Sequence, residues 1–276
     1  MDIPVSLQTK YSMLRDSIAG LGSALVSFSG GVNSTFLLKT AGELLRDGVL
    51  AATFRSPIHP EREWREAHDF CAAEKIPLVF CDVDELSMEY FSINRGDRCA
   101  ICRLCQSAHL WELANSRGIK HVIEGSGADE DSDHKKGFQV AAEKGVRSPL
   151  RESGLIKAEI RALARHIGLA TWNKPSYSCL AARFAEGEPV TYEKLRMVDF
   201  AEQLLIDLGF QGARVSIHGF TARIQMDAVS MARFAESNLR DIIVHALRGF
   251  GFKDVTLDLQ DWRRSEIFLD GDLKIE

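Results

Sequence analysis

Residues 24–35 read Ala-Leu-Val-Ser-Phe-Ser-Gly-Gly-Val-Asn-Ser-Thr. An apolar run, 24–28, leads directly into two glycines, and a stretch with helical spacing, 34–45, follows at once. Adjacent glycines allow backbone conformations that a Cβ forbids, so the turn can direct several N–H groups into one concavity. The N-terminus of the following helix adds partial positive charge. The stretch predicts a phosphate-binding turn; the alternative is an ordinary strand-to-helix turn with Ser34 as the helix N-cap.

The chain around this turn alternates strands and helices. Apolar runs predict strands at 23–28, 49–54, 77–82 and 121–124. Helical spacing predicts helices at 6–19, 34–46, 59–74, 84–91, 98–117 and 155–167, and a polar loop is predicted at 125–137. The alternation predicts an α/β fold with a parallel sheet covered by helices on both faces. Ligands of such sheets bind beyond the carboxyl ends of the strands, so one rim should carry Phe28, Ser29, Phe54, Ser56, Asp82, Glu124 and Gly125.

The pattern changes after residues 170–186. A long helix is predicted at 191–208, strands at 213–218, 221–226 and 254–257, and helices at 227–237 and 238–248. This second pattern is α+β rather than alternating. We therefore expect two domains, 1–170 with the glycine turn and 171–276 as a smaller α+β domain for substrate binding and oligomerisation.

Composition limits the classes of function. The 276 residues are 45% hydrophobic and 26% charged, and the net charge of −5 argues against a strongly basic nucleic-acid-binding surface. No apolar run approaches the length of a membrane span, and the N-terminus lacks a signal pattern, so we expect a cytoplasmic protein. Six cysteines in a reducing compartment do not form a disulfide framework.

The cysteines are unevenly placed. Cys99 and Cys102 lie three positions apart at the start of a predicted helix, where thiolates are favoured, and Cys105 follows. Such a pair is typical of zinc, of a redox couple or of an iron–sulfur cluster. For Cys105, and more strongly for Cys71 and Cys81, burial as small apolar side chains is the favoured interpretation.

The glycine turn lacks the Gly-Lys-Ser/Thr of a Walker A loop and the Gly-x-Gly-x-x-Gly of dinucleotide-binding proteins. It resembles the PP-loop, usually Ser-Gly-Gly-x-Asp-Ser, of the Rossmann-like ATP pyrophosphatases (the adenine nucleotide alpha hydrolase-like fold). These enzymes adenylate a substrate oxygen and release pyrophosphate. The usual Asp is Asn33 here, which keeps the hydrogen-bonding shape and loses a charge that could help to hold Mg²⁺.

Further motifs follow in order along the chain: Asp97-Arg98-Cys99-x-x-Cys102, Arg147-Ser148-Pro149-Leu150, Trp172-Asn173-Lys174-Pro175 and Ser178-Cys179-Leu180-Ala181-Ala182-Arg183. Together with the loop they resemble the LarE family over nearly the whole chain. The resemblance implies an ATP-dependent sulfur transferase that converts carboxylates of a pyridinium mononucleotide into thiocarboxylates for the nickel-pincer cofactor. It also implies a homo-oligomer.

Some LarE proteins sacrifice a cysteine, which lies one position earlier, where this chain has Ser178. Others use three cysteines to hold a 4Fe-4S cluster whose open iron carries the transferred sulfide. This chain matches the three-cysteine pattern, so the resemblance implies that Cys99, Cys102 and Cys179 hold such a cluster and are the catalytic cysteines.

The resemblance implies ATP, Mg²⁺ and the cluster as cofactors. It also implies which other residues bind ATP, the substrate and Mg²⁺. For ATP and pyrophosphate they are Ser29, Gly30, Gly31, Asn33, Ser34, Thr35, Phe54, Ser56 and Gly125. For the substrate's phosphate and carboxylates they are Arg183, Arg214 and His218, whose arginine forks suit such groups. For Mg²⁺ the weaker candidates are Asp129 and Glu130.

Other functions remain open at this stage. A PP-loop tRNA thiolase also combines this loop with a pair of cysteines, but it needs a basic RNA-binding face. A second alternative is a non-catalytic, zinc-stapled nucleotide-binding protein in which Asn33 marks lost activity. A PP-loop amidotransferase or synthetase is a further variant, although no glutaminase segment is evident in the chain.

Overall fold

The structure is a computed structural model that describes residues 3–129, 135–175, 177–236 and 238–260. Its larger sheet contains four strands, β1 (Ala24–Ser27), β2 (Val49–Arg55), β3 (Leu78–Asp82) and β4 (Val122–Glu124). They run parallel in the order β3-β2-β1-β4. Their carboxyl ends therefore lie along one edge, which confirms the predicted α/β fold and the predicted rim.

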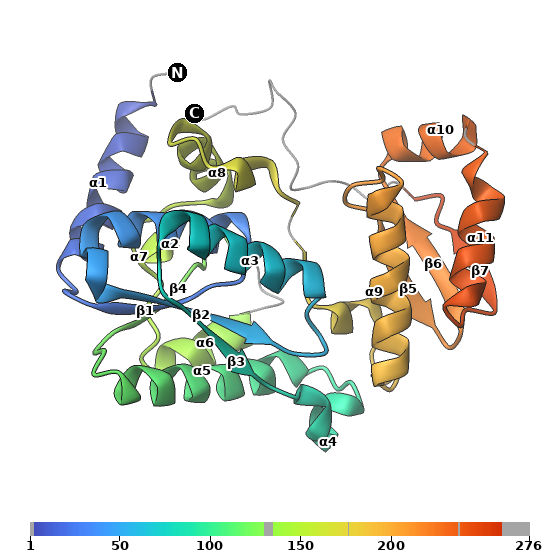
Figure 1. Ribbon diagram of the computed structural model, residues 1–276, viewed down its shortest axis with the longest axis horizontal. Coiled ribbons are helices and arrows are strands. Elements are labelled where there is room, and N and C mark those ends of the chain that lie inside the picture. The colour runs from blue at the N-terminus through green and yellow to red at the C-terminus, as the bar shows by residue number, and fades with distance from the viewer. Residues whose placement is uncertain (1–2, 130–134, 176, 237, 261–276) are drawn as a thin grey trace.

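Helices cover both faces of this sheet (Figure 1). One face carries α1 (Val5–Ala19), α2 (Val32–Leu45), α3 (Glu61–Glu74) and α8 (Lys157–His166), and the other carries α5 (Arg98–Ser116) and α6 (Lys135–Glu143). The side chains of β1 alternate between two cores, because Ala24 and Val26 pack in one and Leu25 in the other. Burial on both faces explains why the strand is a continuous apolar run.

Two local expectations were wrong. Helix α2 begins at Val32 with Gly31 as its N-cap, so Ser34 is inside the first turn and its hydroxyl donates to the Gly31 carbonyl at 3.1 Å. Helix α6 begins at Lys135, inside the range predicted as a polar loop. Gly137 explains how this helix packs closely, since a Cβ there would lie 3.1 Å from the Cγ of Arg103 on α5.

Short elements complete this part of the chain. They are two single-turn helices, α4 (Glu89–Ser92) and α7 (Pro149–Glu152), and 3-10 turns at η1 (Arg46–Gly48), η2 (Glu85–Ser87), η4 (Ala170–Asn173) and η5 (Leu180–Arg183). The predicted helix at 84–91 is thus divided between η2 and α4. The division falls at Met88, whose extended backbone cannot continue a helix.

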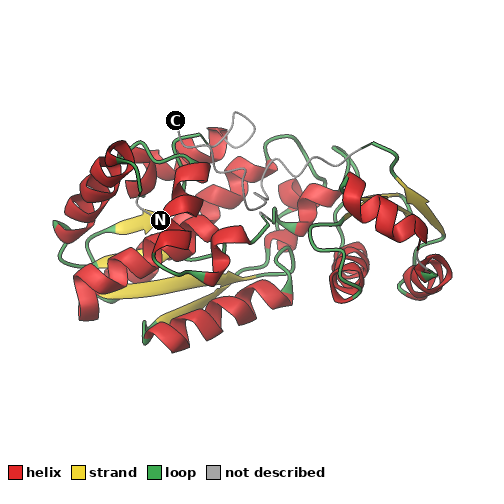
Figure 2. Ribbon diagram, turned by 90° about the horizontal axis from the view of Figure 1, so that it is seen from above, coloured by secondary structure: helices red, strands yellow, loops and turns green. Residues whose placement is uncertain are grey.

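A second, smaller sheet lies beside the first (Figures 1 and 2). It joins β5 (Arg214–His218) antiparallel to β6 (Thr221–Gln225), which pairs in parallel with β7 (Asp254–Leu257). Helices α9 (Tyr192–Asp207), α10 (Ala228–Glu236) and α11 (Leu239–Gly249) accompany it. Its core also includes Ile58 and Phe91 from the first half of the chain. The division into domains 1–170 and 171–276 stays a prediction.

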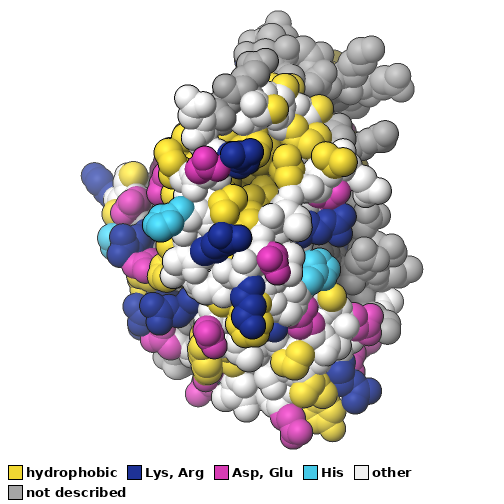
Figure 3. Space-filling model, turned by 90° about the vertical axis from the view of Figure 1, so that its right-hand side faces the viewer, with side chains coloured by type: hydrophobic (Ala, Val, Ile, Leu, Met, Phe, Trp, Pro, Cys, Tyr) yellow, Lys and Arg dark blue, Asp and Glu magenta, His cyan; other side chains and the backbone are white. Residues whose placement is uncertain are grey.

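Figure 3 shows the face of the molecule at the end that carries the smaller sheet and its helices. Hydrophobic side chains gather there between scattered lysines and arginines. On the helices of this part, Val229 is 78% exposed on α10 and Ile242 is 54% exposed on α11. Among the described residues, no helix combines the length and apolar character that crossing a bilayer requires.

Candidate active site

The glycine turn is held by its own hydroxyls. Ser29 Oγ lies 3.0 Å from Ser34 Oγ and accepts the Gly31 N–H at 3.4 Å. Gly30 has φ = +72°, a conformation that disfavours side chains, and a Cβ there would lie 3.4 Å from the Glu63 carbonyl on α3. The turn is therefore a compact loop whose backbone is closed in by α3.

The end of β4 adjoins this loop. A Cβ on Gly125 would lie 2.8 Å from the backbone nitrogen of Ser34, closer than real side chains approach, so only glycine fits there. Thr35 is buried, and its hydroxyl has no hydrogen-bond partner within the described part of the chain. The loop, Gly125 and Thr35 thus lie together, as the rim of a phosphate site requires.

A lysine that the sequence analysis did not assign touches the loop. Lys174 Nζ donates to the Gly30 carbonyl at 3.0 Å and to Glu66 at 2.5 Å. Its segment is fixed by the fully buried Arg161, whose guanidinium donates to the carbonyls of Trp172 at 2.6 Å and Lys174 at 2.8 Å. The available signal was an arginine inside the apolar run 160–164 of a predicted helix.

Residues after β2 form a second part of the site. Phe54 and Ser56 are both buried, and Ser56 Oγ accepts the Ile58 N–H at 3.2 Å while its hydroxyl donates to Glu85. Glu85 is completely buried, and its other oxygen accepts the Cys102 thiol at 3.9 Å. Burial raises the pKa of Glu85, and the Ser56 hydrogen bond opposes this shift. No sequence pattern singled out Glu85.

The three cysteines of the predicted triad are neighbours. Cys99 and Cys102 lie in the first turns of α5, and Cys179 directly precedes η5. Burial raises the pKa of Cys102, and the nearby Glu85 and Cys179 raise it further. Burial also raises the pKa of Cys179, with Cys99 adding to the shift and Arg98 and Arg183 opposing it. The three groups therefore sense one another electrostatically, and burial favours the protonated thiol at Cys102 and Cys179.

Their donor chemistry is of the kind that a cluster of iron and sulfide takes, because all three are soft sulfur atoms. No group of three or more His, Cys, Asp or Glu side chains within the described ranges is arranged to hold a metal ion. The cluster ligands accordingly stay a prediction. The other cysteines are packed as expected: Cys71 is buried in the larger core, Cys81 packs beside β2, and Cys105 contacts Met88.

Of the three predicted substrate ligands, Arg183 is engaged internally. It is 3% exposed, its Nε donates to Glu202 at 2.6 Å, and Nη1 donates to Ser178 Oγ at 2.7 Å. Arg214 is half-buried and His218 is exposed, and both lie on one face of β5 because strand side chains alternate. All three roles stay predictions, and Arg183 also orients the residue before Cys179.

Of the two predicted Mg²⁺ ligands, Asp129 is the one that the structure describes. Both carboxylate oxygens of Asp129 accept the backbone N–H of Lys157, at 2.9 and 3.1 Å, at the start of α8. Glu130 lies outside the described residues.

Two further titratable groups lie near the loop. Burial raises the pKa of Glu63 to about 7 against the opposing charges of Lys174 and Arg62, and burial lowers the pKa of His59 to about 4 with help from Arg103. Glu63 Oε1 and His59 Nδ1 are buried and make no hydrogen bond to the described residues. Polar atoms of this kind mark a place where a ligand or water completes the site.

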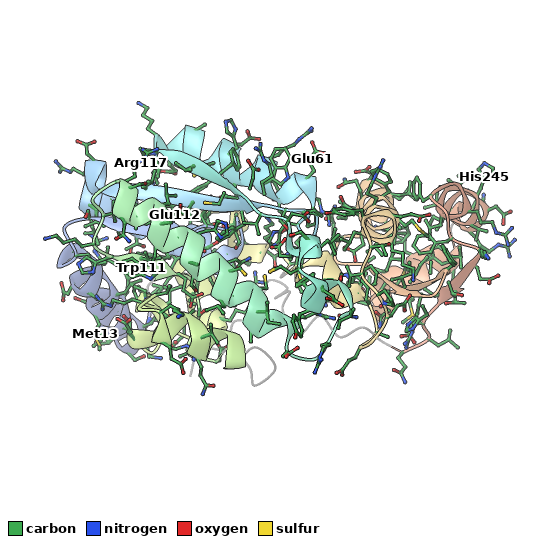
Figure 4. All side chains as sticks on the ribbon, turned by 90° about the horizontal axis from the view of Figure 1, so that it is seen from below. Met13, Glu61, Trp111, Glu112, Arg117 and His245 are labelled. Atoms are coloured by element: carbon green, nitrogen blue, oxygen red, sulfur yellow. The ribbon has the colours of Figure 1, made fainter. Side chains whose placement is uncertain are left out.

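The start of α5 opens to solvent beside Cys99. A hollow of about 140 Å³ is lined there by Arg95, Gly96, Arg98, Cys99, Phe184 and Glu186. Figure 4 shows that Arg117, at the other end of α5, lies away from the smaller sheet, whereas Glu61 at the start of α3 faces it. The cysteines and the start of α3 therefore lie at the end of the larger sheet nearest the smaller one.

Comparison with known proteins shows where the chain belongs. No protein-family model matches it. It is 33% identical over 261 residues to an uncharacterized protein of Synechocystis sp., covering 95% of this chain and 97% of that protein. It is 31% identical over 259 residues to the pyridinium-3,5-bisthiocarboxylic acid mononucleotide synthase of Lactiplantibacillus plantarum, covering 94% and 93%. The chain belongs to the LarE family. Membership confirms the resemblance read from its motifs, and it makes this LarE chain an enzyme.

Proposed function

We propose that this chain is an ATP-dependent sulfur transferase of nickel-pincer cofactor synthesis. Its substrate is a pyridinium mononucleotide carboxylate of the 3,5-biscarboxylate type, which it converts to the thiocarboxylate. The observation that carries the proposal is the turn Ser56–Ile58. Ser56 donates to Glu85, whose other oxygen accepts the Cys102 thiol, and the Ile58 carbonyl accepts the N–H of Leu180, next to Cys179. The predicted nucleotide-binding segment after β2 is thus connected to the Cys102 thiol and to the segment that carries Cys179.

The first half-reaction is adenylation. A substrate carboxylate oxygen attacks the α-phosphorus of ATP, and pyrophosphate leaves with its electron pair. The N–H groups of Gly30 and Gly31 and the hydroxyls of Ser29, Ser34 and Thr35 line the position of the leaving pyrophosphate, with Asn33 beside them. Because these dipoles are already oriented, they stabilise the developing charge with little reorganisation. Lys174 donates to the carbonyl of Gly30 in the loop backbone, and it adds positive charge at the same place.

The second half-reaction replaces AMP by sulfur, which attacks the activated carbonyl carbon. Cys99, Cys102 and Cys179 would hold a 4Fe-4S cluster, which would supply the sulfide. The buried thiols must lose protons to become ligands, so loading releases protons and is favoured by high pH. Phe54 and Ser56 border the adenine, and Gly125 lets the end of β4 approach the loop.

The substrate's charged groups are assigned to Arg214 and His218, with Arg183 holding Ser178 beside them. Asp129 and Glu130 would hold Mg²⁺, which would supply positive charge beside the ATP phosphates. The enzyme acts as a homo-oligomer, which the exposed apolar side chains of α10 and α11 support. These assignments rest on membership of the LarE family, and the formation of AMP, pyrophosphate and thiocarboxylate tests them together.

The deciding experiment is anaerobic iron and sulfide analysis of the wild type against Cys179→Ala after reconstitution. About four irons per chain and a brown colour are expected for the wild type, and both should fall sharply in the variant. Incubation with ATP and the pyridinium biscarboxylate mononucleotide should then yield AMP, pyrophosphate and thiocarboxylate by mass spectrometry. Colourless, iron-free wild type that does not differ from Cys179→Ala contradicts the proposal.

A further inference from the structure

Glu85 is a carboxylic acid with 0% exposure, placed in the turn η2 after β3. One of its oxygens accepts the Ser56 hydroxyl, and the other accepts the Cys102 thiol at 3.9 Å. A carboxyl group can accept hydrogen bonds at both oxygens at once. Glu85 therefore joins the segment that follows β2 to the first turns of α5.

The connection continues beyond Ser56. Its Oγ accepts the Ile58 N–H at 3.2 Å, and the Ile58 carbonyl accepts the Leu180 N–H at 2.8 Å. Leu180 directly follows Cys179. One buried carboxyl is thus linked to Cys102 directly and to the Cys179 segment through three hydrogen bonds, although the two cysteines lie far apart in the sequence.

A buried carboxyl is a costly way to fill space, because its desolvation is only offset when its oxygens are bonded. An apolar side chain would fill the same volume without that cost. What the carboxyl adds is direction, since its two acceptors demand donors at set positions. Here one donor is the Cys102 thiol itself, and the other is Ser56, which is connected through Ile58 to the segment of Cys179.

We propose that Glu85 is a positioning residue that sets Cys102 and Cys179 at a fixed separation. The inference rests on the proposed function, because that separation matters only where the thiols act together. Glu85 is completely buried, and it acts through Ser56 and Cys102. Loss of its two acceptors frees Cys102 at once and loosens the turn that holds Leu180.

The test measures the alkylation rate of each cysteine in the metal-free protein, with iodoacetamide and peptide mass spectrometry. Three variants each remove a different part of the connection. Glu85→Met fills the space without an acceptor, Glu85→Gln keeps one acceptor oxygen, and Ser56→Ala cuts the connection to Ile58 while leaving Glu85 beside Cys102. Circular dichroism and thermal melting establish that each variant is folded.

We expect Glu85→Met to accelerate alkylation of both Cys102 and Cys179 about tenfold, the factor that corresponds to one lost buried hydrogen bond. Glu85→Gln should restore the slow rate at Cys179, since its amide oxygen still accepts the Ser56 hydroxyl. Ser56→Ala should accelerate Cys179 alone. Glu159→Gln is the matched control, because Glu159 is a buried carboxyl paired with Lys10 at 2.7 Å in another region, and its rates should equal the wild type.

Wild-type rates in Glu85→Met would show that only the volume matters and would overturn the proposal. Equal acceleration of the alkylation of Cys102 and Cys179 in Ser56→Ala would overturn the connection from Glu85 through Ser56 and Ile58 to the Cys179 segment. Iron content after anaerobic reconstitution gives a second readout, in which Glu85→Met loads less iron than Glu85→Gln. If the wild type itself takes up no iron, the proposed cluster fails, while the alkylation rates still decide the role of Glu85.

Discussion

Glu63 and His59 are two buried groups with opposite pKa shifts. The native state keeps the proton of Glu63 up to a pKa of about 7, whereas the usual value is 4.5. It keeps His59 neutral down to a pKa of about 4, whereas the usual value is 6.5. Glu63 therefore lowers stability as pH rises from 4.5 to 7, and His59 raises stability as pH rises from 4 to 6.5. Between pH 4.5 and 6.5 the two contributions oppose each other.

Removing either group should expose the other's pH dependence. We expect the free energy of unfolding of Glu63→Gln to rise with pH between 4.5 and 6.5 by about 3 kcal/mol relative to the wild type, and that of His59→Asn to fall by a similar amount. Urea denaturation at four pH values measures both. Glu61→Gln, an exposed carboxyl on the same helix, should parallel the wild type, and parallel curves for all variants would contradict the shifts.

Arg161 is a second residue whose buried charge has a defined task. Its two hydrogen bonds hold the carbonyls of Trp172 and Lys174, and through them the Lys174 contact to the loop. Arg161→Met should cost about 2–4 kcal/mol of stability, because two buried carbonyls lose their donors, and should slow pyrophosphate release. Arg117→Met, at the exposed end of α5, should change stability by less than about 0.5 kcal/mol. Equal losses of stability in Arg161→Met and Arg117→Met would contradict the proposed role of Arg161.

At the scale of elements, the approach of β4 to the loop is the narrowest fit. A methyl group on Gly125 would lie 2.8 Å from the Ser34 nitrogen, so Gly125→Ala must displace the start of α2. We expect about a tenfold or greater loss of ATP affinity and a loss of 1–3 kcal/mol of stability, roughly the cost of overpacking. Calorimetric titration with ATP measures the first. Gly20→Ala is the control, because its nearest contact would be 3.6 Å, and unchanged affinity in Gly125→Ala would contradict the packing.

The elements themselves could be predicted from the sequence, because strands buried on both faces are continuous apolar runs and the helices show a clear apolar side. Helix α6 was not predicted at all, since its first residues are lysines and a glycine within a polar stretch. The predicted rim could be read from strand ends. The contacts of Glu85, Lys174 and Arg161 could not, because their partners are Cys102, Gly30 and the 172–174 carbonyls, which only tertiary packing brings near; Arg161 alone had a signal, its place in the apolar run 160–164.

At the scale of the whole molecule, the two sheets are joined by a charged contact. Arg62 on α3 donates to Asp199 on α9 at 2.7 Å and lies 3.6 Å from the buried Glu202, which also pairs with Arg183. The guanidinium is packed against the ring of Tyr177 at 5.6 Å. This contact links the loop's covering helix to the helix that supports Arg183.

Arg62→Met should therefore weaken the coupling between the two parts, since it leaves Asp199 half-buried without its cation. We expect a stability loss of about 3 kcal/mol and an unfolding curve that broadens or divides into two transitions. Differential scanning calorimetry with fluorescence as a second probe measures this. Arg65→Met, an exposed neighbour on α3, is the control, and a single sharp wild-type transition in Arg62→Met would show that the contact does not couple the parts.

The placement of Cys179 after η4 has a consequence for biosynthesis of the protein. A ribosome completes all four strands of the larger sheet, the glycine turn and the first two cysteines before it reaches Cys179. The nucleotide rim can fold early, whereas the third sulfur joins only when its segment folds back onto Ile58. Any maturation that needs all three thiols is therefore a late event in the life of the chain, and a truncated product that ends before Cys179 is immune to it.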